Sequence, residues 1–494
     1  MSGGPGIADR VGGLVRTAIA LYGDSPGGPE LRAVDARLAE PLRVAIAGRV
    51  KAGKSTLLNA LVGQQLAATD AGECTRIVTW YVDGLTYRVT LHPRQGPPRQ
   101  LPFRRLGGSL DIAMDGVAAA DVERLVVEWP APTLADMSLI DTPGMGSMST
   151  DVGQRSEALL TPEDEVDGAP AEVDAVVYLM RHVHGEDVRF LGTFQDGSAD
   201  RNPMNTVGVL ARADEVGHAR PDALEVAARI ATRYAADLRI RALCRTVVPV
   251  AGLLASSAAA LRETEYRSIE LLAACPDLDR LLLTADRLLT GSPRLELLDD
   301  ERAALLDRFG MFGLRLATRL VRDGAVSSAT DLAHELLTAS GLPLLRAVLA
   351  DQFAARADVL KARSALMGLE SIMRRYPLPA AAGLAHDVER VRAGAHEFAE
   401  ISLIDAIRTG AVPLSSGDLR AAEQLLGAAG TDARTRLGLP RDASPEGVRK
   451  LAAEHHLRWQ QRAEHPASPR EVAQAARLLV RTCEGILGDF PTVE

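Results

Sequence analysis

The feature that most constrains the fold is a glycine-rich stretch, residues 48–55, which reads Gly-Arg-Val-Lys-Ala-Gly-Lys-Ser. It matches the pattern G-x-x-x-x-G-K-[ST] of a phosphate-binding loop. Residues 42–47 before it are an apolar run, and residues 56–62 after it place apolar side chains at helical spacing. Because the motif binds nucleotide only between a strand and a helix, the sequence predicts an α/β nucleotide-binding domain here. A glycine-rich turn before a buried helix is the alternative interpretation.

The loop sequence suggests how a nucleotide would be held. Backbone N–H groups of such a loop surround the β-phosphate, and the helix N-terminus adds partial positive charge. Lys54 is expected to reach the β- and γ-phosphates, and the Ser55 hydroxyl is expected to bind Mg²⁺. Two of the four lysines of the chain, Lys51 and Lys54, fall in this loop. The predicted nucleotide contacts in this region are Gly48, Arg49, Lys51, Ala52, Gly53, Lys54, Ser55 and Thr56.

Composition narrows the class of protein. The chain has 494 residues, 47% hydrophobic and 24% charged, which is typical of a soluble globular protein with about three domains. A net charge of −9 argues against nucleic-acid binding, which needs basic surface. The four cysteines lack paired or metal-ligand spacing, and the N-terminus lacks a signal-peptide pattern. We therefore expect a cytoplasmic protein whose membrane contact is peripheral.

Strand and helix patterns alternate between residues 42 and 252. Residues 77–82 and 87–91 flank Asp83-Gly84, which is typical of a β-hairpin. Continuous apolar runs predict strands that are covered on both faces of a mostly parallel sheet. These runs are residues 125–129, 137–140, 175–179, 205–210 and 245–250.

Beyond Ala251 the pattern is entirely helical. Apolar residues recur at positions i, i+3 and i+4, with Glu and Arg on the opposite face. Residues 344–374 carry this spacing without interruption and predict one long helix. Residues 7–21 and 30–39 predict helices before the first strand.

The two switch regions of a GTPase are predicted from short motifs. The strand at residues 137–140 leads into Asp141-Thr142-Pro143-Gly144. Asp141 would bind the metal through water, and the Gly144 N–H would contact the γ-phosphate. Thr75, in a loop just before a strand, is the candidate to complete the Mg²⁺ shell, with Thr69 as the alternative. The predicted metal ligands are thus Ser55, Thr75 and, through water, Asp141.

Base recognition is predicted at residues 211–214, where Ala-Arg-Ala-Asp stands in place of the usual [NT]-K-x-D. Asp214 can accept hydrogen bonds from guanine N1–H and the 2-amino group, which adenine does not offer. The Arg212 side chain can lie on the base as lysine does. Ala211 lacks the polar side chain that ties this loop to the phosphate loop, so ATP remains an alternative to GTP. Ala251 occupies the place of the remaining base-side loop.

The machinery for hydrolysis is unusual because no glutamine follows Gly144; residues 145–148 are Met-Gly-Ser-Met. Lys51 holds the third variable position of the phosphate loop, where guanylate-binding proteins and atlastins carry an internal arginine finger. It is a candidate to stabilise transition-state charge, and a solvated lysine is the equal alternative. The predicted catalytic residues are Lys51, Lys54, Ser55, Thr75 and Gly144.

With these motifs in order, the chain resembles the bacterial dynamin-like proteins. The resemblance covers essentially the whole length, and it is clearest at residues 43–57, 75–80, 126–130, 308–313, 340–342 and 358–362.

The resemblance implies an α/β P-loop GTPase domain with a mostly parallel sheet and an extended all-α helical bundle, the neck and trunk. It implies a large GTPase that uses GTP/GDP and Mg²⁺. The arginine-rich composition fits an actinobacterium. The implied division is N-terminal helices packed with the bundle at 1–41, a dynamin-type G domain at 42–262, a helical continuation or neck at 263–350, and the neck and trunk at 351–494.

The family further implies a homodimer through G domains, or a hetero-assembly with a sister dynamin-like protein, at the inner face of the cell membrane. It implies that GTP hydrolysis remodels or maintains that membrane. Residues 376–384 are the first candidate for the lipid-contacting tip and residues 411–414 the second, with plain interhelix loops as the alternative. Two other functions stay open: a GTP-regulated scaffold without remodelling activity, and an ATP-using P-loop enzyme.

Overall fold

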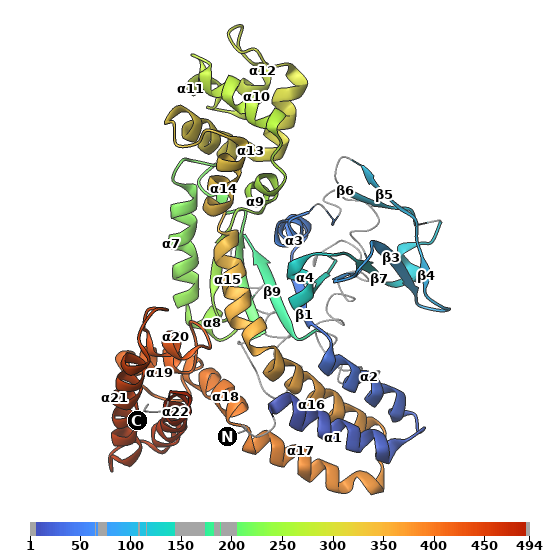
Figure 1. Cartoon of the computed structure of the whole chain (residues 1–494), viewed down its shortest axis with the longest axis vertical. Helices are drawn as coiled ribbons and strands as arrows, with labels where there is room; N and C mark the ends of the chain where they lie inside the picture. Colours follow the sequence, from blue (N-terminus) through green and yellow to red (C-terminus); the bar gives the residue numbers. More distant parts are fainter. Residues whose placement is uncertain are drawn as a thin grey trace.

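The computed structural model of the chain is elongated, with a β-sheet in the middle and helices at both ends (Figure 1). The structure describes residues 6–64, 66–67, 77–106, 109–114, 116–143, 173–181, 188 and 205–490. Among these residues, no helix combines the length and apolarity needed to cross a bilayer.

Among the described residues, nine strands form the central sheet, in the order β11-β10-β9-β1-β8-β2-β7-β3-β4. The five strands from β11 to β8 are all parallel, which confirms the mostly parallel sheet expected from the apolar runs. β5 and β6 form a separate two-stranded sheet. The strands are β1 (Leu42–Gly48), β2 (Thr79–Val82), β3 (Arg88–Pro93), β4 (Arg99–Gln100), β5 (Phe103–Leu106), β6 (Ser109–Ile112), β7 (Val122–Glu128), β8 (Met137–Asp141), β9 (Ala175–Met180), β10 (Thr206–Ala211) and β11 (Val247–Val250).

The predicted β-hairpin around Asp83-Gly84 is wrong. β2 and β3 do not pair, because β7 lies between them, parallel to β2 and antiparallel to β3. β7 buries Leu125 and Val127, so it gains more from pairing on both sides than a two-stranded ribbon would gain alone. The turn residues Asp83-Gly84 favour a hairpin locally, but β7, from later in the chain, pairs with both β2 and β3 instead.

The sheet is covered on both faces, which explains the continuous apolar runs. In β1, Val44 and Ile46 belong to the core on one side, while Ala45 and Ala47 belong to the core on the other. The helices that follow the strands are α3 (Lys54–Val62), α4 (Pro132–Asp136), α7 (Ala223–Ala236), α8 (Leu238–Arg241) and α9 (Gly252–Ala259).

A helical cap, defined here as α10 to α14, lies at one end of the molecule (Figure 1). It packs against α9, and its core includes Ala251 and Ala223 at the ends of connections from the sheet. The cap therefore rests on the edge where the parallel strands end. Its helices are α10 (Glu263–Ala274), α11 (Leu278–Leu281), α12 (Ala285–Thr290), α13 (Asp299–Arg322) and α14 (Ala329–Ala339).

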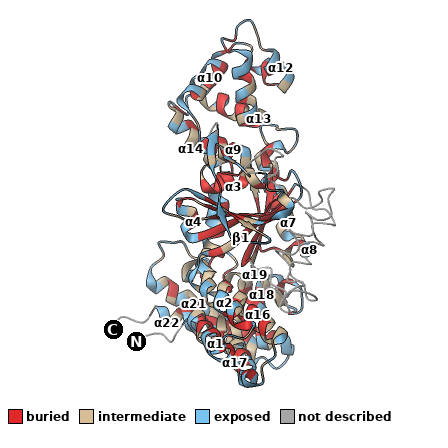
Figure 2. Ribbon diagram, turned by 90° about the vertical axis from the view of Figure 1, so that its right-hand side faces the viewer, coloured by how far each residue is buried: buried red, intermediate tan, exposed pale blue. Residues whose placement is uncertain are grey.

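The opposite end holds two further helical units (Figure 2), each with its own cluster of buried residues. A four-helix bundle joins the N-terminal helices to helices from the middle of the chain: α1 (Ile7–Tyr22), α2 (Gly27–Ala39), α16 (Ala357–Arg375) and α17 (Ala382–Gly394). The C-terminal lobe consists of α18 (His396–Arg408), α19 (Ser416–Leu425), α20 (Ala433–Leu437), α21 (Pro445–Glu464) and α22 (Arg470–Asp489).

The single long helix predicted at residues 344–374 is wrong, because it is divided between α15 (Leu342–Gln352) and α16. α15 packs on the sheet through Leu345 and Leu349, whereas α16 belongs to the four-helix bundle. Phe353 is fully buried at the break. Apolar spacing alone could not reveal the break, since both helices keep the same period.

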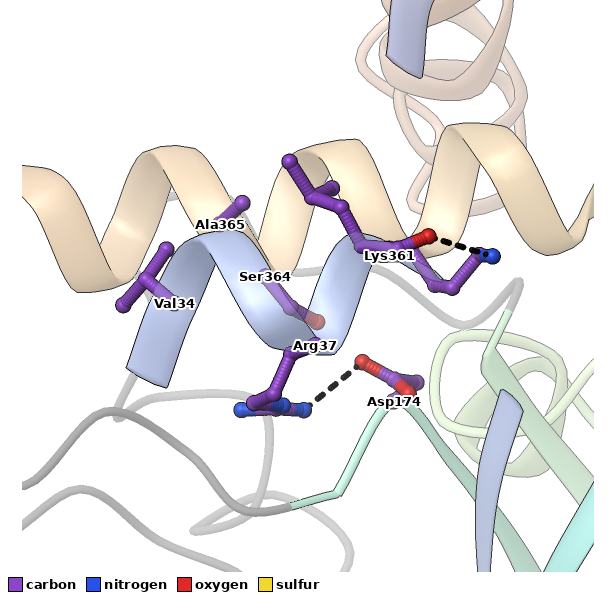
Figure 3. A pocket seen from close by; sticks show the side chains of 7 residues that line it. Val34, Arg37, Asp174, Lys361, Ser364 and Ala365 are labelled. Carbon is purple, nitrogen blue, oxygen red and sulfur yellow. Dashed lines mark hydrogen bonds and ion pairs between the residues drawn. The ribbon is translucent and has the colours of Figure 1, made fainter. Parts of the chain in front are cut away.

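The four-helix bundle is attached to the sheet by a buried ion pair (Figure 3). Arg37 of α2 pairs with Asp174 at 3.0 Å, and these side chains are only 15% and 3% exposed. Asp174 also accepts from the backbone N–H of Arg43, at 2.9 Å. Lys361 of α16 donates to the Leu38 carbonyl at 2.9 Å. The adjoining cavity encloses about 10 Å³, too little for a ligand larger than water.

The C-terminal lobe is attached through arginines. Buried Arg408 donates to the Arg245 carbonyl at 3.1 Å and pairs with Glu423 at 3.1 Å. Arg245 in turn donates to the carbonyls of Gly427 and Ala428. Burial, reinforced by two neighbouring guanidinium groups, holds the pKa of Arg245 well below its usual range. The arginine side chains at this junction thus outnumber the carboxylates beside them, and backbone carbonyls accept their remaining hydrogen bonds.

Residues 376–384 and 411–414 connect helices at this end. The Tyr376 hydroxyl donates to Glu30 at 3.0 Å, while Leu384 and Val412 are buried. Within the described residues, neither connection presents a large exposed apolar side chain. Lipid contact through them stays a prediction that their packing does not favour.

Replacing Gly341 by alanine is expected to destabilise the fold strongly. Gly341 has a φ of +78°, and an added Cβ would lie 2.2 Å from the Pro249 carbonyl oxygen of β11. Gly324 has a φ of +68° but open space, so Gly324→Ala is the matched control. We expect Gly341→Ala to lower the free energy of unfolding by roughly 3 kcal/mol or more and the control by about 1 kcal/mol, as measured by urea unfolding. Equal losses would show that α15 can move away from β11.

Candidate functional site

The glycine-rich loop connects β1 to α3 at the edge where the parallel strands end. Gly48, the last residue of β1, has a φ of +149°, and a Cβ there would lie 2.6 Å from the Leu179 carbonyl oxygen. A glycine is required because neighbouring β9 passes so closely. Ala52 is buried beneath the loop, Gly53 precedes the first turn of α3, and Thr56 lies within that turn.

Lys54 is buried and its ammonium group faces the loop. Nζ donates to the carbonyl oxygens of Gly48 at 3.1 Å and Arg49 at 3.3 Å. Burial lowers the pKa of Lys54, and the nearby charge of Asp141 opposes that shift. A buried cation held at a helix N-terminus is well placed to receive phosphate oxygens.

Ser55 and Asp141 meet beside this lysine. The Ser55 hydroxyl donates to Asp141 Oδ2 at 3.1 Å. Asp141 Oδ1 is buried and has no hydrogen-bond partner among the described residues. Burial raises the pKa of Asp141 to about 6, although Lys54 and Ser55 both lower it. The Thr142 hydroxyl donates to the Ile46 carbonyl at 2.9 Å, which fastens the end of β8 to β1.

This donor set fits a magnesium ion. A hydroxyl and a carboxylate with one orphaned oxygen are the hard oxygen ligands that Mg²⁺ prefers. Ser55 would bind the ion directly, and Asp141 would hold it through water. When bound, the ion supplies positive charge to the β- and γ-phosphate oxygens.

The proposed base side lies at the end of β10. Asp214 is buried in a short 3-10 turn, Ala213–Glu215, and burial raises its pKa to about 6. Its carboxyl is therefore mostly ionised at neutral pH. Arg212 has a φ of +54° and donates to Glu215 at 2.8 Å, and Arg181 also pairs with Glu215. Sequence reasoning missed both Glu215, which directly follows Asp214, and Arg181, which directly follows β9.

Ala251 is buried just after β11 and donates its backbone N–H to the Ser340 carbonyl at 2.9 Å. The base-side loop is thereby held by the turn between α14 and α15. That support comes from 89 positions further along the chain, and the local sequence carries no signal for it.

Lys51 is exposed, with a φ of +62° in the loop. A non-glycine residue in this conformation costs about 1 kcal/mol and persists only where its surroundings hold it. Val50 beside it is 45% exposed. The loop thus turns a cation and an apolar side chain outward. The finger role of Lys51 stays a prediction.

Several predicted positions lie outside the described residues: Thr75, its alternative Thr69, Gly144 and residues 145–148. The chain leading towards Thr75 is anchored at its start, because the Asn59 side chain accepts from the N–H groups of Leu66 and Ala67 and donates to the Ala67 carbonyl. Sequence reasoning did not identify Asn59.

The chain is similar in sequence to known proteins. Residues 44–213 match the dynamin family. The chain is 40% identical over 496 residues to the isoniazid-induced protein IniC of Mycobacterium tuberculosis, covering 98% of this chain and 99% of that protein. It is 31% identical over 150 residues to a bacterial dynamin-like protein of Nostoc punctiforme, covering 28% of this chain and 20% of that protein.

Among solved structures, the chain is similar to one described as an oligomerised bacterial dynamin pair that provides a mechanism for the long-range sensing and tethering of membranes. The similarity covers 97% of this chain and 74% of the other, with 13% identity and a TM-score of 0.32.

Replacing Asp141 by asparagine is expected to stabilise the nucleotide-free protein. The folded-state pKa of Asp141, about 6, lies above its value in an unfolded chain. The carboxyl therefore destabilises the fold progressively between about pH 4 and pH 6, and fully above that range. We expect Asp141→Asn to raise the free energy of unfolding at pH 7.5 by on the order of 1–2 kcal/mol, with the gain shrinking towards pH 4.

Urea unfolding at several pH values would measure this gain, with exposed Asp136→Asn as the control. If Asp141→Asn does not raise the free energy of unfolding at pH 7.5, Lys54 and Ser55 fully offset the cost of burying the Asp141 carboxylate.

Proposed function

The chain belongs to the dynamin family, within the group of bacterial dynamin-like GTPases that includes IniC, and we propose that the site built around Lys54, Ser55 and Asp141 is where it binds and hydrolyses GTP. The observation that carries the assignment is the meeting of a buried ammonium, a hydroxyl and a buried carboxylate at the ends of adjacent parallel strands. That arrangement fits a nucleoside triphosphate with its metal ion.

The proposed mechanism relies on positions that the chain already holds. Lys54 would exchange its bonds to the Gly48 and Arg49 carbonyls for bonds to phosphate oxygens. The N–H groups of residues 52–56 would surround the β-phosphate. Lys51 would place a further positive charge near the transferred group, in a reaction whose catalysis is largely positioning and charge stabilisation.

We assign the preference for GTP over ATP to Asp214. Its ionised carboxylate would accept two hydrogen bonds from guanine, and it is buried, so a base that leaves it unpaired would be disfavoured. Arg212 would contribute its stem rather than a free charge, because its guanidinium pairs with Glu215.

We further propose that two G domains meet across the nucleotide, in a homodimer or with a sister dynamin-like protein. Exposed Val50 and Lys51 beside the site support a face that a partner covers. In this proposal residues 42–262 form the G domain, 263–350 its helical continuation, and 1–41 with 351–494 the neck and trunk. The separate buried clusters of the cap, the bundle and the C-terminal lobe support such a division.

We also propose peripheral contact with the inner face of the cell membrane, where GTP hydrolysis would remodel or maintain the bilayer. Four exposed leucines fall within residues 271–298 of the cap: Leu271, Leu283, Leu289 and Leu298. Their elements lie together at one end of the molecule (Figure 1). An apolar tip of this kind can insert shallowly between lipid headgroups.

Substitutions of Lys51 and Lys54 are expected to distinguish an effect on GTP hydrolysis from an effect on GTP binding. Lys54→Ala removes the buried cation, so we expect GTP turnover to be abolished. Lys51→Ala removes an exposed charge that would act in the transition state, so we expect turnover to fall about tenfold or more with GTP affinity unchanged. Phosphate release and calorimetric binding measure the two effects. Equal turnover in Lys51→Ala would remove its finger role, and unchanged hydrolysis in Lys54→Ala would discard the site.

Liposomes test the membrane proposal. We expect vesicles containing phosphatidylglycerol to stimulate GTP turnover, to bind the protein and to be deformed by it. The double variant Leu283→Ser with Leu298→Ser should lose most co-sedimentation, because these side chains are 57% and 72% exposed in the cap. Leu238→Ser with Leu457→Ser is the matched control, with exposures of 69% and 56% elsewhere on the surface.

The same assay separates the alternatives. Slow turnover that ignores lipid would instead favour a GTP-regulated scaffold. Faster turnover with ATP than with GTP would favour an ATP-using enzyme and would overturn the role of Asp214.

A further inference from the structure

Arg315 of α13 joins the helical cap to the loop that follows Asp214. Its Nε and one terminal nitrogen donate to the Leu282 carbonyl at 2.9 and 2.7 Å, and the same terminal nitrogen donates to Leu283 at 3.1 Å. The other terminal nitrogen donates to the Ala219 carbonyl at 2.5 Å. One planar guanidinium thus binds two segments at once, one within the cap and one at the base side of the site.

The segment held at Ala219 is strained. Gly217, His218 and Ala219 have consecutive φ values of +63°, +63° and +57°. Left-handed backbone costs roughly 1–2 kcal/mol for each non-glycine residue, and such strain persists only where the surroundings hold it. Ala219 also packs partly against the core of the cap. The cap therefore supplies two of the contacts that hold this conformation, the hydrogen bond from Arg315 and the packing of Ala219.

The strained segment continues directly from the residues assigned to base recognition. The N–H groups of His218 and Ala219 donate to the Glu215 carbonyl, at 3.1 and 3.4 Å. Glu215 ends the 3-10 turn that contains Asp214, and α13 packs against that turn. A release of Ala219 would thus free the backbone four and five residues after Asp214, on the side that faces the cap.

We propose that Arg315 is a positioning residue for base recognition: by holding residues 217–219 in a left-handed turn, it keeps Asp214 directed at the guanine. The proposal rests on the assignment of Asp214 to guanine under the proposed function. Since Arg315 belongs to the cap, the orientation of the cap and the affinity for the guanine base become linked. Linkage is reciprocal, so guanine binding stabilises the attached cap to the same degree.

A purely structural role for Arg315 predicts something different. If Arg315 only fastens the cap, its loss would lower stability and would weaken all nucleotides equally. If it positions Asp214, its loss would weaken guanine nucleotides more than nucleotides that lack one of the two hydrogen bonds. Inosine diphosphate provides this comparison, because hypoxanthine keeps N1–H but lacks the 2-amino group.

The experiment measures affinities of the full-length protein for GDP, IDP and ADP in Arg315→Ala and Arg315→Lys. We expect Arg315→Ala to weaken GDP about tenfold and to lower the preference for GDP over IDP by about threefold or more. Lysine keeps the charge but carries its donors on one nitrogen, which does not reproduce the reach of the guanidinium fork from Leu282 to Ala219, so we expect Arg315→Lys to lower the preference as well. It also serves as the test should the alanine variant fail to fold.

Arg322→Ala is the matched control. Arg322 is also on α13 and donates to the Ala273 and Cys275 carbonyls at 2.9 and 3.2 Å, both within the cap. Its loss removes a similar clamp without touching residues 217–219. We expect the Arg322→Ala variant to prefer GDP over IDP to the same degree as the wild-type protein.

A second variant tests the route through Asp214. In an Asp214→Ala background, removal of Arg315 should leave GDP affinity unchanged, because nothing remains to be positioned. An undiminished preference for GDP over IDP in both Arg315 variants overturns the inference. If the wild-type protein shows no preference for GDP over IDP or ADP, the assignment of Asp214 to guanine is itself overturned. That outcome is distinct from a failure of the inference about Arg315.

Discussion

The central constraint on this structure is a buried positive charge at the end of β1. Lys54 is enclosed by its own loop, with backbone carbonyls and a nearby carboxylate as its only described hydrogen-bonding and charge partners. That arrangement needs β9, β1 and β8 side by side, because β9 shapes the loop at Gly48 and β8 delivers Asp141. Because both faces of the sheet are covered by helices, polar groups gather at the ends of its strands.

Besides apolar packing, arginines that donate to backbone carbonyls attach the helical units to the rest of the structure. Arg346 of α15 binds the last turn of α3, and Arg315 binds the base-side loop. Arg408 of the C-terminal lobe binds the Arg245 carbonyl before β11, and Arg356 binds the Gly427 carbonyl of that lobe. Guanidinium suits this task because its planar fork reaches several carbonyls at once. The bundle and the C-terminal lobe each keep a buried cluster of their own, whereas the buried cluster of the cap also includes Ala223 and Ala251 from connections of the sheet.

Contacts to other parts of the molecule lie on both sides of a single strand, β11. Before β11, Arg245 is bonded to the C-terminal lobe, and after it, Ala251 is bonded to the turn that starts α15. β11 has only four residues, Val247–Val250, and is parallel to β10, which carries the base-side turn. β11 and the residues that flank it therefore join three parts of the molecule: the base side of the site, the C-terminal lobe and the turn between α14 and α15.

The sequence by itself determined the phosphate loop, the parallel half of the sheet and the helical character of everything after Ala251, because these depend on local patterns of glycine, apolar runs and periodicity. It also determined Asp141 and Asp214 as candidates, since Asp141 ends a buried strand and Asp214 lies three residues after the end of another. Only the tertiary structure decided that β7 separates β2 from β3, that α15 ends at Gln352, and that Ser340 and Arg315 support the base side. These features depend on contacts between residues far apart in the chain, whose energies no local pattern records.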